Sequence, residues 1–405
     1  MSRAREFSIV AVSLLSSATP ALAQCEWQWR NFDADASSTV RTFFPWDVDH
    51  DGVSELFVGG SFSEIGGVSA SGLAVWDGVG FSAFPDPPFQ SVDDLVEFRG
   101  ALYCVGNSAL YHWNGTEWDY VESAPFPIDG LHVHADNLIV HGAFTRCIKR
   151  WDGTAWYDYG LGMSDGYLGD APSVDAVAIY NGELYAGGNF NEADGRCCTT
   201  VVRWDGTTWQ SLPDGPEPKT KVLAVFDGKL YAGGLSRLPW YQPLSYWDGS
   251  SWTFVNGLEG FDADVFALAE FDGTLVLGGA FEGPHELIAF WDGQSFSGLG
   301  RGIDGVAVFA LAEFNGDLYA GGWFDEIDRL PIESFGIWTY APDGDANGDL
   351  KVDLSDLGIV LRSFSTCNGN PLFDHAAGRL GDNGNTCVDL EDLNEVLTSW
   401  GATCE

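Results

Sequence analysis

A strand-like motif that ends in a glycine pair returns along this chain of 405 residues. One clear copy, Leu184–Phe190, reads LYAGGNF, and the seven copies place their second glycine at residues 60, 106, 142, 188, 234, 279 and 322. In the copies that end at 106 and 142, valine and histidine replace the first glycine. The copies are 36 to 46 residues apart, a period typical of β-propeller blades, each of which buries its faces only by packing against its neighbours.

Each repeat contains the signals for four strands. The apolar segment 174–180 ends at Asn181-Gly182, a pair that favours a type I′ hairpin turn into the glycine-pair strand. A third strand then ends at a Trp-Asp-Gly or Trp-Asn-Gly corner, and a fourth begins at the next aromatic residue. These corners lie at residues 76–78, 113–115, 151–153, 204–206, 247–249 and 291–293. We therefore predict a mainly β chain: a seven-bladed β-propeller of four-stranded antiparallel blades over residues 24–340, followed by a small α-helical module over 341–405.

The last repeat lacks its fourth strand, because no Asp-Gly corner follows Trp338. The segment 27–32 near the N-terminus alternates in polarity and has no hairpin partner of its own. We predict that it supplies the outer strand of the last blade, which would close the ring and remove an open sheet edge.

The first 23 residues have the three parts of a secretory signal peptide: Arg3 and Arg5, an apolar run over 7–15, and the small-x-small sequence Ala21-Leu22-Ala23 before the predicted cleavage site. No other apolar run is long enough to span a bilayer, so we expect a secreted or cell-surface protein without membrane insertion. Eight cysteines in an exported chain are compatible with disulfide bonds. Cys197 and Cys198 are adjacent and could pair with each other or with two different partners.

The formal net charge of −40 excludes whole classes of partner. A chain this acidic repels the phosphates of nucleic acids and the surfaces of anionic membranes. High acidity is more often a solubility trait than a binding site, and we interpret it so.

The segment after residue 344 has the oxygen pattern of a calcium-binding loop. Oxygen ligands occupy positions 1, 3, 5, 9 and 12, and position 7 offers its backbone carbonyl. These positions are Asp345, Asn347, Asp349, Asp353 and Asp356, with Lys351 at position 7. A helical spacing of apolar residues follows over 357–364. We predict a calcium ion here.

A second, weaker copy ends at Asp392. Its ligand positions 3, 5, 7, 9 and 12 are Asn383, Asn385, Cys387, Asp389 and Asp392. Position 1 falls on Gly381, so this loop has fewer carboxylates and should bind calcium more weakly, or be purely structural.

These two loop-helix units resemble a type I dockerin, an EF-hand-like module, over residues 343–405. The resemblance rests on Asp345, Asn347, Asp349 and the Val352-Asp353 and Asp356-Leu357 pairs, with a second set over 388–393. It implies calcium-dependent folding and docking onto a cohesin-like or other cell-envelope protein, often in polysaccharide-degrading assemblies. The chain departs from the family at Leu350, where glycine is usual, and at 354–355 and 390–391, where a Ser-Thr pair is often found. Calcium binding is therefore better supported than cohesin docking.

The Gly-Gly-x-Phe and Trp-Asp-Gly-x-x-Trp motifs of residues 41–340 resemble kelch and galactose-oxidase propellers, which specifies a fold more than a function. A copper centre of that class needs two histidines, and only His132 and His134 form an alternating pair. We interpret them as polar residues of a degenerate repeat, with a metal site as the alternative. No nucleophile elbow, phosphate loop or HExxH helix is present.

Two further features lie outside the repeat. The alternating carboxylates of Asp47, Asp49 and Asp51 occupy a hairpin turn and resemble a propeller calcium hairpin, with a simple acidic turn as the alternative. Most tryptophans recur at fixed blade positions, as core packing requires, but Trp240 and Trp323 do not and are candidates for a ligand surface.

We expect a secreted, non-catalytic binding protein whose propeller takes a glycan or protein ligand and whose tail binds calcium and docks onto another protein. The alternative is an extracellular carbohydrate-active enzyme, either a glycan hydrolase or a galactose-oxidase-like enzyme, with its site on the propeller. An enzyme would need carboxylates or histidines converging at one mouth of the ring.

Overall fold

The computed structural model describes residues 25–342, apart from 31–33, 49, 86, 122–123, 165–170, 217–218, 236–241, 259–262 and 283–284. Of the C-terminal segment it describes the isolated residues 352, 354, 357, 361, 396, 397 and 399. Contacts divide the chain into one unit of residues Gln28–Thr339 and a second unit that contains the two terminal segments.

The described residues form seven four-stranded sheets, which we number in chain order. Sheet 1 consists of β2 (Val40–Trp46), β3 (Glu55–Gly60), β6 (Leu73–Trp76) and β7 (Phe81–Ala83). Sheet 2 consists of β8 (Val92–Phe98), β9 (Ala101–Gly106), β10 (Ala109–Trp113) and β11 (Trp118–Tyr120). Sheet 3 consists of β12 (Gly130–His134), β13 (Asn137–His141), β14 (Ile148–Trp151) and β15 (Trp156–Asp158). Sheet 4 consists of β17 (Ser173–Tyr180), β18 (Glu183–Asn189), β21 (Val201–Trp204) and β22 (Trp209–Ser211).

The remaining sheets continue the series. Sheet 5 consists of β23 (Lys219–Phe226), β24 (Lys229–Leu235), β25 (Leu244–Trp247) and β26 (Trp252–Phe254). Sheet 6 consists of β27 (Asp264–Phe271), β28 (Thr274–Ala280), β29 (Ile288–Trp291) and β30 (Phe296–Ser297). Sheet 7 consists of β31 (Ile303–Phe314), β32 (Asp317–Ile327), β33 (Phe335–Pro342) and β1 (Cys25–Arg30). Two small sheets pair β4 (Glu64–Ile65) with β5 (Val68–Ser69), and β16 (Met163–Ser164) with β19 (Glu192–Ala193) and β20 (Arg196–Cys197).

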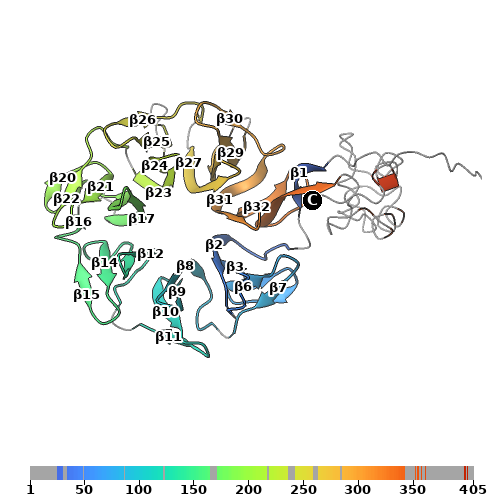
Figure 1. Cartoon of the computed structure of the whole chain (residues 1–405), viewed down its shortest axis with the longest axis horizontal. Helices are drawn as coiled ribbons and strands as arrows, with labels where there is room; N and C mark the ends of the chain where they lie inside the picture. The colour runs from blue at the N-terminus through green and yellow to red at the C-terminus, as the bar shows by residue number, and fades with distance from the viewer. Residues whose placement is uncertain are drawn as a thin grey trace, which may run out of the picture. The chain divides into compact units, whose positions relative to one another are not determined.

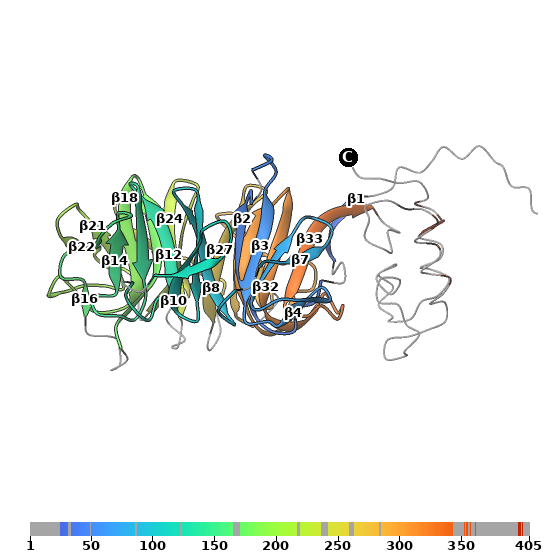
Figure 2. The same ribbon diagram turned by 90° about the horizontal axis from the view of Figure 1, so that it is seen from below.

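The sheets of the unit Gln28–Thr339 are arranged in a ring with the first strand of each repeat innermost (Figure 1). Each innermost strand contacts the innermost strand of the next sheet, and β31 contacts β2, so the series closes on itself. Seen from the side, the strands run roughly along the axis of this ring (Figure 2).

The hydrophobic core lies between consecutive sheets. One cluster joins Ile139 and Ile148 of sheet 3 to Leu184 and Val202 of sheet 4, all almost completely buried. The innermost strand β17 alternates between buried and half-buried side chains along its whole length, as expected for a strand that packs on both neighbours. The predicted stacking of sheets that cannot bury both faces alone is therefore confirmed.

The glycine pair has two separate packing roles. A Cβ on Gly233 would lie 2.7 Å from the Val265 Cγ1 atom of the next sheet, so the first glycine allows close packing between sheets. A Cβ on Gly234 would lie 2.0 Å from the Lys219 carbonyl oxygen, so the second glycine allows close approach to the innermost strand. The predicted close backbone approach is thus confirmed, and it explains why both positions recur.

The hairpin turns and outer corners also form as predicted. Asn181 and Gly182 both have positive φ, 51° and 80°, as a type I′ turn requires. At the outer corner of sheet 4, Asp205 Oδ1 accepts hydrogen bonds from the backbone NH groups of Thr207 and Thr208 at 2.9 and 2.8 Å. The tryptophans that flank this corner pack against each other across the strands, with ring centroids 5.2 Å apart. These recurring tryptophans therefore serve the core.

The predicted closing strand is present. β1, described over Cys25–Arg30, joins the edge of β33 and so becomes the outer strand of sheet 7; residues 31 and 32 of the predicted segment lie outside the described residues. Trp29 is buried, its ring lies 5.4 Å from that of Trp338, and its Nε1 donates a hydrogen bond to the Leu299 carbonyl at 3.3 Å.

The disulfide prediction is wrong for the four cysteines whose environment the structure describes, because all four are free thiols. Cys104 and Cys147 are buried in different core clusters, too far apart in the fold to bond. Cys197 is exposed on β20, whereas Cys198 is half-buried, so the adjacent pair faces two environments and is not bridged.

Candidate functional site

The innermost strands share a β-bulge at one position. In sheets 1, 2, 4, 5, 6 and 7 the pairing between the first and second strands skips one residue of the first strand. In sheet 3, β12 begins at Gly130, the residue just after the bulge position. Asp129 N donates to the His141 carbonyl at 2.8 Å, which places Asp129 at the position that matches the other bulges. We call these seven residues the bulge ring: Arg41, Asp93, Asp129, Asp175, Lys221, Phe266 and Phe309. A bulge turns a side chain out of the regular alternation of the strand.

A cavity of about 780 Å³ lies where the innermost strands begin. Six residues of the bulge ring line it, all except Phe266, and we call it the axial cavity. Its other lining residues are Thr39, Ser91, Ser108 and Trp323. Because the innermost strands all run from this mouth of the ring, the same position of six repeats contributes to one site.

Two ion pairs occupy part of the axial cavity. Arg41 Nη1 lies 2.6 Å from Asp93 Oδ1, and Lys221 Nζ lies 2.7 Å from Asp175 Oδ2. Asp175 also accepts a hydrogen bond from Ser173 Oγ at 2.7 Å. Each pair links the innermost strands of neighbouring sheets, so these two carboxylates are already engaged.

Asp129 lies between these two pairs in the ring order and differs from them. Within the described part of the chain, its carboxylate has neither a hydrogen-bond nor an ion-pair partner. Burial raises its pKa to about 6, with further increases from Asp175 and Asp93 and an opposing decrease from Lys221. Asp129 is exposed to the cavity, but neighbouring protein atoms displace part of the water around its carboxylate. The site thus holds one carboxylate that titrates near neutral pH.

The other side of the axial cavity is aromatic. Phe309 lines it and packs on Phe266, with ring centroids 5.4 Å apart. Trp323 on β32 is 59% exposed, the most exposed tryptophan of the described residues. It stands directly after a glycine pair, where the other repeats have small or polar residues or leucine. The expectation that Trp323 offers a ligand surface fits this position, whereas Trp240 lies outside the described residues.

The junction between sheets 2, 3 and 4 contains polar residues that sequence reasoning missed. His141 replaces the first glycine of its repeat, is buried, and places Nδ1 2.9 Å from the Val174 carbonyl oxygen of sheet 4. Asp94 is partly buried and accepts the Leu131 NH of sheet 3 at 2.7 Å, and desolvation of its carboxylate raises its pKa to about 6. Both lie beside Gly130, where a Cβ would collide with the His141 ring. The histidine at position 141, where most repeats have glycine, was the sequence signal that could have pointed to this polar junction.

The histidine pair singled out in the sequence does not belong to a group of three or more His, Cys, Asp or Glu side chains among the described residues. His132 and His134 lie on β12, and burial, together with His141 and His134, lowers the pKa of His132 to about 4. In the part of the chain that the structure describes, no group of three or more His, Cys, Asp or Glu side chains could hold a metal ion.

A second cavity of about 430 Å³ lies between sheets 3 and 4, where the innermost strands end. His134, Arg150, Glu183 and Trp204 are among its lining residues. Its charged groups have partners: Arg150 donates to Asn137 Oδ1 at 3.3 Å and lies over the Tyr157 ring, and Glu183 pairs with Arg203.

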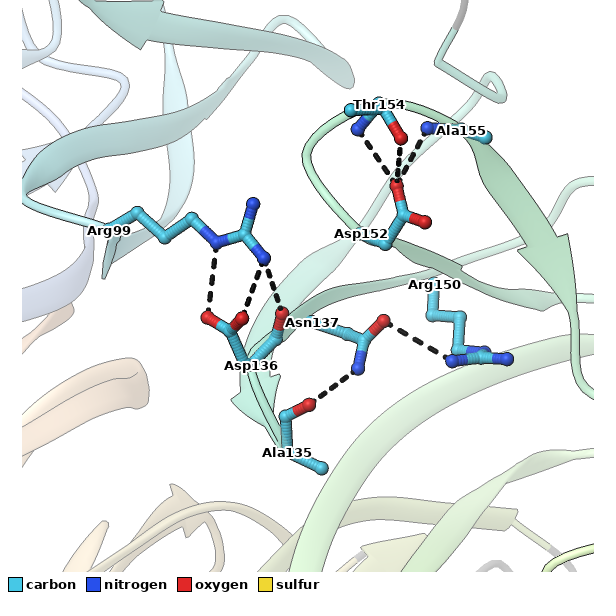
Figure 3. A network of polar contacts seen from close by, with 8 residues as sticks. All are labelled: Arg99, Ala135, Asp136, Asn137, Arg150, Asp152, Thr154 and Ala155. Atoms are coloured by element: carbon cyan, nitrogen blue, oxygen red, sulfur yellow. Dashed lines mark hydrogen bonds and ion pairs between the residues drawn. The ribbon is translucent and has the colours of Figure 1, made fainter.

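Figure 3 shows the polar network around this second cavity. Arg99 of sheet 2 binds Asp136 of sheet 3 in a fork, with Nε–Oδ1 and Nη2–Oδ2 distances of 3.0 and 2.7 Å. Asp152 holds its own corner by accepting the NH groups of Thr154 and Ala155, both at 2.8 Å. These contacts link and cap the sheets, so the network is structural.

The predicted calcium ligands within 345–356 and 383–392 lie outside the described residues. Leu354, Leu357 and Leu361 have helical backbone, and Val352 and Val396 are buried. In the hairpin of sheet 1, Asp47 accepts the NH groups of Asp51 and Gly52 at 3.1 and 3.0 Å, while Asp49 lies outside the described residues. Calcium at both places stays a prediction.

Among the described residues, no helical segment combines the length and hydropathy of a membrane span. No protein-family model and no curated protein matches the chain.

Solved structures of propeller domains resemble the fold. The extracellular domain assigned to the hybrid two component system BT3049 of B. thetaiotaomicron superposes with a TM-score of 0.54 and 11% identity, over 81% of this chain and 45% of that one. The extracellular domain assigned to the one component system BT4673 of B. thetaiotaomicron superposes with a TM-score of 0.52 and 11% identity, over 80% of this chain and 43% of that one. The chain therefore spans less than half of these two domains.

A smaller structure matches over nearly its whole length. YCF48, solved with a D1 peptide bound, gives a TM-score of 0.50 and 12% identity, covering 80% of this chain and 98% of that one. At such identities the likeness shows the fold alone: the chain is a mainly β protein of four-stranded antiparallel sheets with the architecture of a β-propeller.

Proposed function

We propose that this chain is an exported, non-catalytic binding protein: a seven-bladed propeller that presents the axial cavity to a ligand. The bulge ring carries this proposal, because one geometry that recurs from sheet to sheet brings six side chains of four types, arginine, lysine, aspartate and phenylalanine, to one cavity. A volume of about 780 Å³ is within the range of ligand pockets, roughly 300–1,000 Å³. Export is supported by the secretory pattern of residues 1–23 and by the likeness to two extracellular domains.

The chemistry of the cavity favours binding over catalysis. Glycan hydrolysis needs two carboxylates free to act as acid and as base or nucleophile. At the axial cavity Asp93 and Asp175 are held by Arg41 and Lys221, which leaves Asp129 alone. A glycan hydrolase or galactose-oxidase-like enzyme remains the alternative, but no arrangement of the described residues supports it.

The C-terminal segment, in this proposal, is a dockerin-like module that binds calcium through Asp345, Asn347, Asp349, Lys351, Asp353 and Asp356. A second loop contributes Asn383, Asn385, Cys387, Asp389 and Asp392. The module would attach the propeller to a cohesin-like or cell-envelope protein, in the setting of polysaccharide degradation. Calorimetric titration of the full chain with calcium, compared with the Asp345→Ala/Asp356→Ala variant, tests this part. We expect micromolar or tighter binding that the double substitution abolishes.

The binding role is tested on the full chain with arrays of glycans and peptides. We expect ligands that bind the wild type and lose at least about tenfold in affinity with Trp323→Ala, since an aromatic contact removed from a ligand site costs on this order. Phe254→Ala is the matched control, because Phe254 is a half-exposed aromatic residue on the outermost strand of sheet 5. If every ligand found is as sensitive to Phe254→Ala as to Trp323→Ala, the axial cavity is not the binding site.

A further inference from the structure

The bulge ring divides into two halves of different chemistry. Five consecutive sheets, 1 to 5, contribute Arg41, Asp93, Asp129, Asp175 and Lys221, which we call the charged arc. Sheets 6 and 7 contribute Phe266 and Phe309, and together with Trp323 these form the aromatic arc. A ligand in the axial cavity therefore meets carboxylates on one side and ring faces or edges on the other.

The charged arc lacks one cation. Its two basic residues each hold one carboxylate, Arg41 that of Asp93 and Lys221 that of Asp175, and the arc is symmetric about Asp129. Asp129 has no such partner within the described residues, yet it is flanked by two other carboxylates. With all five groups ionised, the arc carries one negative charge in excess, located at its centre.

A positive group would complete this arrangement. An ammonium or guanidinium placed at Asp129 would gain a charge-assisted hydrogen bond, which is about twice as strong as a neutral one. An anionic ligand would instead meet three carboxylates. A calcium ion is coordinated by six to eight oxygen ligands. Among the described residues, no group of three or more His, Cys, Asp or Glu side chains could hold a metal ion.

The aromatic arc selects among cations. Trp323 is largely exposed and lines the cavity with Phe309. Aromatic faces attract organic cations and bury apolar carbon, whereas a strongly hydrated inorganic cation gains nothing from a second, apolar wall.

We infer that the axial cavity binds an organic cation, an ammonium or guanidinium attached to an apolar chain or ring, with the charge at Asp129 and the apolar part against Trp323 and Phe309. This inference rests on the proposed binding function and names its ligand class. The same chemistry can come from a free amine or from a lysine or arginine side chain of a partner protein.

Three small probes with the same ring and different charge test the ligand class: 2-phenylethylammonium, 2-phenylethanol and 3-phenylpropanoate. Binding to the full chain at pH 7.5 is followed by ligand-observed NMR titration. We expect the ammonium to bind about tenfold tighter than the alcohol, since a hydrogen bond between two charged groups is stronger than one from a neutral hydroxyl. The carboxylate should bind most weakly.

Two charge-neutralising variants assign the effect to a residue. Asp129→Asn should lower the affinity for the ammonium about tenfold and leave the affinity for the alcohol within about twofold. Asp272→Asn is the matched control: it removes the same charge at a hairpin turn at the other end of an innermost strand, a position where two other repeats carry asparagine. It should change neither affinity.

A blocked Phe-Lys dipeptide, N-acetylated and C-amidated, and its Nζ-acetylated form probe the protein source in the same assay. Binding of the charged dipeptide alone supports recognition of a basic side chain, and binding of 2-phenylethylammonium alone supports a free amine. Equal affinity for the ammonium and the alcohol, no binding by either cation, or no effect of Asp129→Asn overturns the inference. The proposed function survives that result if array ligands still depend on Trp323, and it fails separately if they do not.

Discussion

The outer corners and the bulge ring use the repeat in opposite ways. At the corners, both geometry and residue type recur: an aspartate, or Asn114 in sheet 2, accepts the same two NH groups in six sheets. At the bulge ring the geometry recurs but the residues do not, changing from arginine to aspartate, lysine and phenylalanine. Positions where sequence and geometry repeat together maintain the fold, whereas a position where only geometry repeats is available for recognition.

The largest expected effect comes from the second glycine of the pair, which lies on β24 beside the bulge of β23. Gly234→Ala places a Cβ 2.0 Å from the Lys219 carbonyl oxygen, so the strands must separate or the bulge must rearrange. We expect a loss of about 3 kcal/mol or more in unfolding free energy, measured by chemical denaturation. Gly80→Ala is the control, because a Cβ there meets no atom within 4 Å, and it should stay within about 0.5 kcal/mol. Similar losses in both variants would contradict this role of the second glycine.

The next effect concerns ligand affinity and pH. Since burial and the neighbouring carboxylates raise the pKa of Asp129 to about 6, only about a tenth of this group is ionised at pH 5. Affinity for 2-phenylethylammonium should therefore fall about fivefold between pH 7.5 and pH 5, because the protonated form keeps the roughly tenfold weaker affinity expected of Asp129→Asn. The charged groups that act on Asp129 are Asp175, Asp93 and Lys221, and Arg41 lines the same cavity; Asp93 is paired with Arg41 and Asp175 with Lys221. In Asp129→Asn, the affinity for 2-phenylethylammonium should not change between pH 7.5 and pH 5. If the affinity of that variant still falls with pH, the titrating group is another residue.

A smaller effect is expected at a corner. Hydrogen bonds from the backbone NH groups of Ser251 and Ser250, and from the Ser250 hydroxyl, lower the pKa of Asp248 to about 2. Asp248→Ala should lower the Tm by a few degrees at pH 7, because the NH groups lose their acceptor. Asp248→Asn should lower the Tm less, as Asn114 holds the same turn in sheet 2. The pKa of Asp248 is lower in the folded state than in the unfolded state. Its contribution to stability should therefore disappear as the pH falls from about 4 to about 2. Equal losses for the two variants would argue against the turn geometry.

The smallest effect belongs to the ion pairs of the charged arc. Arg41→Gln removes the partner of Asp93 in a cavity that water reaches, and exposed pairs contribute about 0–1 kcal/mol. We expect a stability change within that range in thermal denaturation. We also expect a measurable gain in affinity for 2-phenylethylammonium, because a second carboxylate loses its cation. A loss of affinity would show that Arg41 itself contacts the ligand.

Much of the fold follows from local rules that the sequence displays. The Asn181-Gly182 turn, the Asp205-Gly206 corner and the glycine pairs each have a physical requirement that few residues satisfy. The closing strand was predictable because sheet 7 lacked an outer strand and the N-terminal segment lacked a partner.

The candidate site was not predictable in the same way, because a bulge residue turned toward a cavity can be of any type. One signal was present: in six repeats the bulge residue stands thirteen positions before the second glycine, as Asp175 does before Gly188. In the first repeat the longer turn after Trp46 increases this spacing to nineteen, from Arg41 to Gly60. An alignment of the repeats on their glycines would have shown a column whose charge and size vary. It would not have shown that these side chains meet, since this depends on closure of the ring.

Closure also sets the order of events in folding. β1 is synthesised about 300 residues before β33, yet the two strands are neighbours in one sheet. The interior sheets form from hairpins of nearby residues, so they can assemble while synthesis proceeds, but sheet 7 must wait for both ends of a segment of about 300 residues. The N-terminal strand is therefore held in an unpaired state until the last repeat emerges.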